Sequence, residues 1–194
     1  SLVTIGGYFN MHDSPSLTSF SGLENLESIG GNLEINNMDA LIDLNGFEEL
    51  SSIGGDLLLT ENALVESMVG LESLGHVGGN TLIRENPALQ NLSGLLSMDS
   101  LYGDVGIMGN AALTSLTGLD SLKYIGGALE INHNQSITDC SGLASLTDVG
   151  TLSIIENDAL QSLTGLDHLS EAGGICIAGN DALTSLTGLE GITY

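Results

Sequence analysis

Basic residues are almost absent from this sequence. Its 194 residues include only two of them, Arg84 and Lys123, against 25 aspartates and glutamates, and the formal net charge is −23. Nucleic acids and anionic membrane surfaces carry charge of the same sign, so the composition argues against binding to either. Such an acidic surface stays soluble in salt, which fits a marine or high-salt habitat and equally an ordinary acidic secreted protein.

Long apolar runs and cysteines are scarce too. No apolar run is long enough to span a bilayer, so we expect no membrane insertion. The two cysteines, Cys140 and Cys176, leave the redox compartment open. Because Cys140 falls in an apolar column and Cys176 in an outward strand position, we expect Cys140 to be a buried thiol and no disulfide between the two.

Catalytic motifs are missing as well. The sequence has no Gly-x-Ser-x-Gly elbow and no phosphate-binding loop with a lysine. Its four histidines lack the spacing of metal ligands, and we expect each of them to be a solvated surface residue: His12, His76, His133 and His168. We therefore expect a protein that is not an enzyme and that holds no metal or cofactor.

What the sequence does contain is one unit repeated about eight times. The unit reads G-G-x-L-x-I-x-x-N-x-x-L-x-x-L-x-G-L-x-x-L-x-x-I, and seven apolar columns stay in phase along the chain. The glycine before Leu or Phe recurs in steps of 24 residues and finally of 23: Gly22, Gly46, Gly70, Gly94, Gly118, Gly142, Gly165 and Gly188. A fixed period of this length is typical of a solenoid.

Each part of the unit predicts a piece of structure. The alternation L-x-I has the period of a strand, so stacked units predict a right-handed coil with one parallel β-sheet of about eight short strands. Apolar residues spaced by three, such as Leu113, Leu116 and Leu119, favour irregular or 3₁₀-like turns over regular α-helix. The paired glycines mark a tight corner. We expect residues 1–194 to form a single solenoid domain, cut from a longer chain since both ends fall within a repeat.

An asparagine follows the strand in six of the units. An inward amide at this sharp turn can bond the backbone of its own turn and of the neighbouring one. Ser14 and Met38 replace it in the first two units, where we expect this ladder to be weakest. The predicted ladder comprises Asn62, Asn86, Asn110, Asn134, Asn157 and Asn180.

The repeat resembles the leucine-rich repeat superfamily, and within it the receptor L-domain type of microbial surface proteins and of insulin and growth-factor receptors. The segment from Leu119 to Ile131, LDSLKYIGGALEI, carries the likeness, which extends over nearly the whole chain. The resemblance implies a leucine-rich solenoid at a cell surface or outside the cell, and it implies no particular ligand. The disulfides that usually close receptor L domains have no counterpart here.

Function is therefore expected on the surface of the solenoid. The outward strand positions place Leu58, Leu82 and Met108 together beside Arg84, which makes these four residues the candidate binding patch. Isolated exposed leucines are ordinary, and Glu61 or Glu85 can neutralise Arg84. A column before the strands, Asn32, Asp56, Asn80 and Asp104, is either a hydrated acidic face or a set of Ca²⁺ ligands, and the hydrated face is the better interpretation.

A further surface carries two rows rich in hydroxyl groups. Their second half is the more regular: Thr114, Thr138, Gln161 and Thr184 in one row, and Thr117, Ser141, Thr164 and Thr187 in the other. Two glycosylation motifs begin at Asn91 and Asn134, the second of which we expect to be buried.

These features leave three hypotheses. The first is a binding or adhesion module that contacts a protein or glycan at a cell surface through the rigid solenoid face. The second is a structural stalk, or a unit that self-associates through its uncapped ends. The third is an ice-binding protein that uses the hydroxyl rows.

Overall fold

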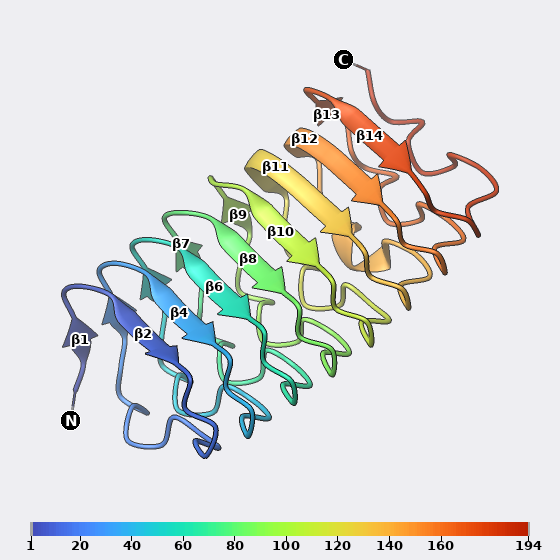
Figure 1. The fold of residues 1–194 in the computed structure, drawn as a ribbon. Helices are drawn as coiled ribbons and strands as arrows, with labels where there is room; N and C mark the ends of the chain where they lie inside the picture. Colours follow the sequence, from blue (N-terminus) through green and yellow to red (C-terminus); the bar gives the residue numbers. More distant parts are fainter. Residues whose placement is uncertain (1, 194) are drawn as a thin grey trace.

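The computed structural model describes residues 2–193 and shows the predicted solenoid: successive coils lie in register along one axis (Figure 1). Each coil contributes one strand to a parallel sheet along one side, and these eight strands define what we call the main face. They are β2 (Phe9–His12), β4 (Leu33–Asn36), β6 (Leu57–Thr60), β8 (Thr81–Arg84), β10 (Val105–Met108), β11 (Tyr124–Asn132), β12 (Asp148–Ile155) and β14 (Ile175–Ala178).

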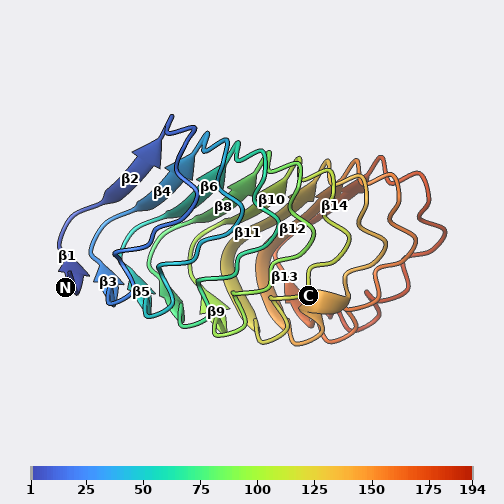
Figure 2. The same ribbon diagram turned by 90° about the horizontal axis from the view of Figure 1, so that it is seen from below.

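A second set of strands, two residues each, lies at the corner where the chain enters the main sheet. Four of them form a separate parallel sheet in the order β1-β3-β5-β7, while β9 and β13 pair with the long strands β11 and β12. The corner strands are β1 (Thr4–Ile5), β3 (Ser28–Ile29), β5 (Ser52–Ile53), β7 (His76–Val77), β9 (Ser100–Leu101) and β13 (Glu171–Ala172). Figure 2, seen from below, shows them following one another along a single edge of the coil.

The corner sheet is interrupted between β7 and β9, where Tyr102 replaces the first glycine of the pair. That glycine faces the carbonyl of the preceding coil at close range: a Cβ on Gly54 would lie 2.3 Å from the Gly30 oxygen. A side chain at this position is therefore incompatible with the close stacking of the first four coils. The broken pairing at Tyr102 is the expected result.

The rest of each coil is irregular, as the spacing of three predicts. Two hydrogen bonds of the i→i+3 kind follow one another in most coils, for example from Leu119 N–H to Leu116 and from Leu122 N–H to Leu119, at 3.1 and 2.9 Å. In residues 2–193 the one helical segment is a 3₁₀ turn, η1 (Ser141–Leu143), and no helix is long and apolar enough to cross a bilayer.

The core consists of the aliphatic rows of the repeat, which point inward and are almost fully buried from Leu26 to Leu169. In the first two coils a cluster of aromatic rings fills this space. The ring centroid of Phe9 lies 6.2 Å from that of Phe20 and 5.8 Å from that of Phe47, in edge-to-face contacts. Cys140 belongs to the buried rows, and burial raises the pKa of its thiol to about 12. Both cysteines are free, and Cys176 is exposed.

The asparagine column forms a continuous ladder inside the coil. Asn86 shows the pattern: its Oδ1 accepts the backbone N–H of Asn62, and its Nδ2 donates to the carbonyls of Leu59 and Arg84, all at 3.0–3.1 Å. Asn62 through Asn157 are fully buried, and Asn180 in the last coil is half-buried. Five of the six amides therefore satisfy backbone groups of two coils at the turn where the β-ladder ends, and Asn110 bonds the backbone of the preceding coil.

The ladder ends towards the N-terminus at Met38. The Met38 N–H still donates to Asn62 Oδ1 at 3.1 Å, but the thioether of Met38 offers no amide to the coil before it. In that first coil the Ser14 hydroxyl donates to the carbonyl of His12 instead.

The glycine that precedes Leu or Phe is required by its backbone. Gly118 has φ +117°, and a Cβ there would lie 2.0 Å from the Leu92 oxygen. Its N–H donates to Asp120 two residues on, at 2.8 Å, and the same bond recurs at Gly22, where it lowers the pKa of Glu24 below its ordinary value. A carboxylate two residues after the glycine is thus part of the repeat, although Leu96 and Ala144 interrupt the column.

Candidate functional site

The four residues of the candidate patch lie together on the main face. Pairing between β6, β8 and β10 places Leu58 opposite Leu82 and places Leu82 opposite Gly106. The next outward row places Arg84 opposite Met108. Leu58, Leu82 and Met108 are half-buried, and Arg84 is exposed.

Gly106 makes the patch continuous. A Cβ at this position would lie 2.7 Å from Leu82 Cδ1 and 3.1 Å from Met108 Cε, so both side chains lean over the glycine from either side. Gly106 itself is buried although it occupies an outward strand position. The two side chains therefore form one apolar surface that spans two strands.

Arg84 is held at the edge of this surface. Its Nε and one terminal nitrogen donate to Glu85 Oε1 at 2.9 and 2.6 Å, while both side chains remain about half exposed. Of the two acids expected beside Arg84, Glu85 makes this ion pair. An exposed pair is worth little, about 0–1 kcal/mol, so a partner's carboxylate can compete for the guanidinium.

Carboxylates flank the apolar patch in its own row. Glu34 pairs in register with Leu58 on one side, and Glu130 pairs in register with Gly106 on the other. Both are half-buried outward residues. At about 4.8 Å per strand, four strand steps place the two residues about 19 Å apart. The main face thus combines an apolar centre with an acid at each side.

The column of Asn32, Asp56, Asn80 and Asp104 is neither free nor simply hydrated. Each side-chain oxygen accepts the backbone N–H of the equivalent residue in the next coil, for example Asn32 Oδ1 from Asp56 N–H at 2.9 Å and Asp56 Oδ1 from Asn80 N–H at 2.7 Å. The row ends where Asp104 Oδ1 accepts the backbone N–H of Ala128. This is a second hydrogen-bonded ladder, and the interpretation of the column as a hydrated face was wrong, because the residue types alone do not show that each oxygen meets an N–H of the next coil. Among residues 2–193, no group of three or more His, Cys, Asp or Glu is arranged to hold a metal ion.

The hydroxyl rows are exposed but interrupted. In the first half of the two rows, the exposed residues include Ile42, Glu66 and Val69. Of the two glycosylation motifs, Asn134 is fully buried in the ladder, and Asn91 is half-buried with its Oδ1 accepting the Ser93 N–H at 3.0 Å. All four histidines are exposed.

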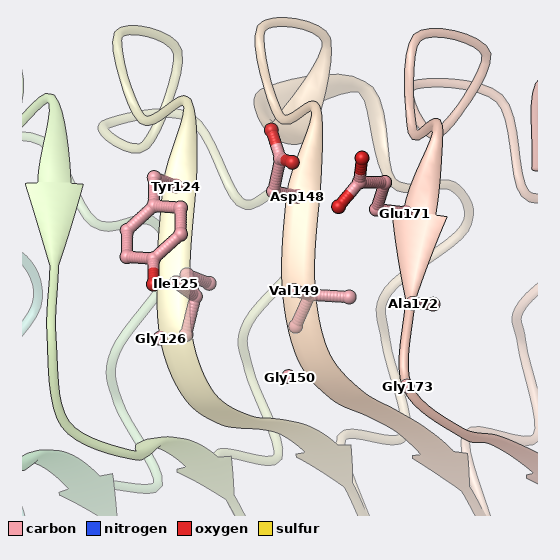
Figure 3. Close-up of a pocket in the computed structure, with 9 residues that line it drawn as sticks. All are labelled: Tyr124, Ile125, Gly126, Asp148, Val149, Gly150, Glu171, Ala172 and Gly173. Atoms are coloured by element: carbon pink, nitrogen blue, oxygen red, sulfur yellow. The ribbon is translucent and has the colours of Figure 1, made fainter. Parts of the chain in front are cut away.

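The structure also contains a hollow that the sequence analysis did not identify. It lies at the corner of three successive coils (Figure 3), and the side chains that border it include Tyr124, Asp148 and Glu171. These three residues occupy one outward row and pair in register through β11, β12 and β13. In the earlier coils the same row holds Thr4, Ser28, Ser52, His76 and Ser100. The change from these residues to a tyrosine and two acids is the sequence signal for the hollow.

Comparisons with protein-family models, with curated proteins and with solved structures found no match to this chain. The solenoid is therefore established from the coordinates, and the likeness to leucine-rich repeats of the receptor L-domain type stays a prediction from the sequence.

Proposed function

We propose that this protein is a non-enzymatic binding module, acting at a cell surface or outside the cell, that recognises a partner protein through the main face. The observation that carries the proposal is the apolar surface that Leu82 and Met108 form over Gly106 beside Leu58. The repeat itself does not require these residues, since the equivalent outward positions elsewhere hold Asn10, Glu34, Glu130 and Ser153.

The charge of the face favours a basic partner. Glu34 and Glu130 flank the patch in register, and the chain as a whole carries a formal charge of −23. A protein segment with apolar side chains between two basic residues complements this arrangement, because it fills the centre and pairs its charges at both sides. The rigid sheet lowers the entropy lost on binding.

Substitution of Leu82 tests the proposal. Leu82→Glu places a charge in the centre of the patch, and we expect at least a tenfold loss of affinity for the partner with unchanged thermal stability. Leu64→Glu is the matched control, since Leu64 is 48% exposed and lies outside the strands of the main face. Partners are isolated by cross-linking on the parent protein and then measured against both variants.

The outcomes are distinct. A basic protein that binds the parent and Leu64→Glu, that loses affinity for Leu82→Glu and that dissociates as salt is raised supports the proposal. Equal binding to the parent and to Leu82→Glu contradicts it. A glycan array that gives specific binding independent of Leu82 indicates a carbohydrate-binding module instead.

A further inference from the structure

The hollow at the corner of the last three coils is the feature that the proposed function leaves unused. Its volume is about 340 Å³, and it is bordered by Tyr124, Asp148 and Glu171 and by the two residues that follow each of them (Figure 3). This volume is at the lower end of the range for small-molecule sites. It suits a single side chain or a compact ligand.

Three glycines form the floor, and the backbone fixes it. A Cβ on Gly126 would lie 2.7 Å from the Tyr102 oxygen, one on Gly150 would lie 2.6 Å from the Gly127 oxygen, and one on Gly173 would lie 2.5 Å from the Gly150 oxygen. None of these positions accepts a side chain unless the coils move apart. These three lining positions therefore remain without side chains as long as the coils stack this closely.

The sequence changes its repeat length at this place. Gly150 stands alone where most of the other coils have two glycines, and the spacing between units falls from 24 to 23 residues. Here β11 and β12 run through the corner without a break, and their register shifts between Ile125 and Ala128.

Tyr124 forms one end of the hollow, and Tyr102 of the preceding coil packs against its ring. The ring centroids of Tyr102 and Tyr124 are 5.8 Å apart with an interplanar angle of 56°. The Tyr124 hydroxyl lies 3.3 Å from the place of a Gly126 Cβ, so the ring extends along its own strand towards the floor, as Figure 3 shows. Tyr124 is 41% exposed, which leaves its surface accessible to a ligand.

Two carboxylates form the other end. Asp148 and Glu171 pair in register on neighbouring coils, and in Figure 3 the Glu171 side chain points towards Asp148. Thr147 Oγ1 donates a hydrogen bond to Asp148 Oδ2. Within the described part of the chain, neither carboxylate makes an ion pair. Their negative charge is therefore available to a ligand.

We propose that this hollow binds an organic cation, namely the guanidinium or ammonium group of an arginine or lysine side chain. The tyrosine ring attracts a cation through its π face, and the two carboxylates accept charge-assisted hydrogen bonds from its N–H groups. The three glycines bring no side chain into the hollow that would compete with this group. A calcium ion is a poorer fit, because it takes six to eight oxygen ligands and this site offers two carboxylates beside an aromatic ring.

Butylguanidine and butylurea are the probes, since they are similar in shape and differ in charge. Titration is followed by the backbone amide signals of the ¹⁵N-labelled protein. We expect butylguanidine to shift the signals of Gly126, Gly150 and Gly173 saturably, with a dissociation constant in the range of about 1–10 mM. We expect at least tenfold weaker binding of butylurea.

Charge-removing variants separate the hollow from the general acidity of the protein. The double variant Asp148→Asn/Glu171→Gln should lose at least fivefold in affinity, and Tyr124→Leu should lose affinity while the charge is unchanged. The control Asp39→Asn/Glu49→Gln removes the same charge from exposed positions elsewhere and should bind as the parent does. The dispersion of the amide spectrum shows that each variant is folded.

Three results would overturn the proposal. The first is an equal loss of affinity in the control pair, which would mean non-specific attraction to an acidic surface. The second is a set of shifts spread over the whole protein. The third is tighter saturable binding of CaCl₂ at the same glycines, which would make the hollow a metal site.

Discussion

Removal of one ladder amide measures how far the internal asparagines hold the coils together. Asn110 lies in the middle of the ladder: its Oδ1 accepts the Asn86 N–H at 3.0 Å, and its Nδ2 donates to the Ile83 carbonyl at 3.0 Å. The side chain is fully buried, so water cannot replace it. Asn110→Ala deprives the Asn86 N–H of its acceptor and the Ile83 carbonyl of one donor.

The expected cost follows from these two bonds. An unsatisfied buried donor costs about 1–3 kcal/mol, and a lost hydrogen bond costs about 0.5–1.5 kcal/mol. Together with the space left by the amide, we expect Asn110→Ala to lower the free energy of unfolding by about 3 kcal/mol. Urea denaturation measures this loss. Gln90→Ala in the preceding coil is the control, because it removes an exposed amide and should cost less than about 0.5 kcal/mol.

The isosteric variant Asn110→Asp separates the contribution of the donated hydrogen bond to stability from that of the accepted one. The aspartate keeps the acceptor for Asn86 but loses the donor to Ile83, and its burial raises its pKa above the unfolded value of about 3.9. Because the pKa is higher in the folded state, the stability that the neutral side chain contributes is fully present below about pH 4 and is lost as pH rises through the folded-state pKa. The deficit relative to the parent should therefore shrink in acid.

Hydrogen exchange adds a local readout. The Asn86 N–H should lose protection in Asn110→Ala and keep it in Asn110→Asp at acidic pH. A cost below about 1 kcal/mol for Asn110→Ala, with an unchanged exchange rate at Asn86, would refute the view that side-chain amides secure this turn.

Two further predictions concern the other columns of the repeat. Leu96→Glu supplies the missing carboxylate for the Gly94 N–H and should raise the free energy of unfolding by about 0.5–1 kcal/mol in moderate salt. Leu64→Glu, at a similarly exposed position, should not raise it. Thermal denaturation compares the two variants, and equal effects would count against a stabilising role of the carboxylate column. Because Cys140 is buried and its pKa is raised to about 12, we expect only the Cys176 thiol to react with Ellman's reagent at pH 8 in the native protein. Both thiols should react after denaturation. The contribution of the buried neutral thiol of Cys140 to stability is complete below about pH 9 and declines as pH rises towards 12. Rapid modification of Cys140 in the native protein would show that the thiol is accessible to the reagent.

The sequence predicts the inward half of this protein well because burial leaves few choices. An inward position must be apolar, or must carry a side chain that satisfies backbone groups, so rows such as Leu113 to Ile125 and the asparagine column can be read directly. The spacing of three likewise predicts the i→i+3 turns. These features follow from one coil and repeat in all of them.

The features that the sequence did not predict are contacts between coils at the surface. The oxygen of Asn32 and the N–H of Asp56 are 24 residues apart, and nothing in either residue type shows that they meet. The carboxylates after the glycine column, such as Asp120, look like ordinary surface acids until the glycine N–H is seen to point at them. The second sheet depends on how the corners stack, and it stops where one tyrosine intrudes.

The candidate sites are hard to predict for the same physical reason. An outward residue costs the fold little, so the repeat tolerates almost any side chain there, and its identity carries no structural signal. The pairing of Asp148 with Glu171, 23 residues further on, is visible only once the short step near Gly150 is placed in register. The hollow therefore depends on a small irregularity, which an alignment of identical repeats would treat as noise.

That contrast gives a criterion for where function lies on a solenoid of this kind. Two ladders of side-chain hydrogen bonds, together with glycines that cannot bear a Cβ, fix the backbone of most coils, so these coils differ mainly in the residues that they display at the surface. Departures from the repeat that the packing of the coils does not require need another explanation. Leu82 on an otherwise largely polar face and the tyrosine–carboxylate row at the corner are such departures. Under the two proposals above, both sites would contact basic groups of a partner, and they lie on different faces of the same solenoid. A partner that engages both would be held at a fixed distance and angle by the solenoid alone.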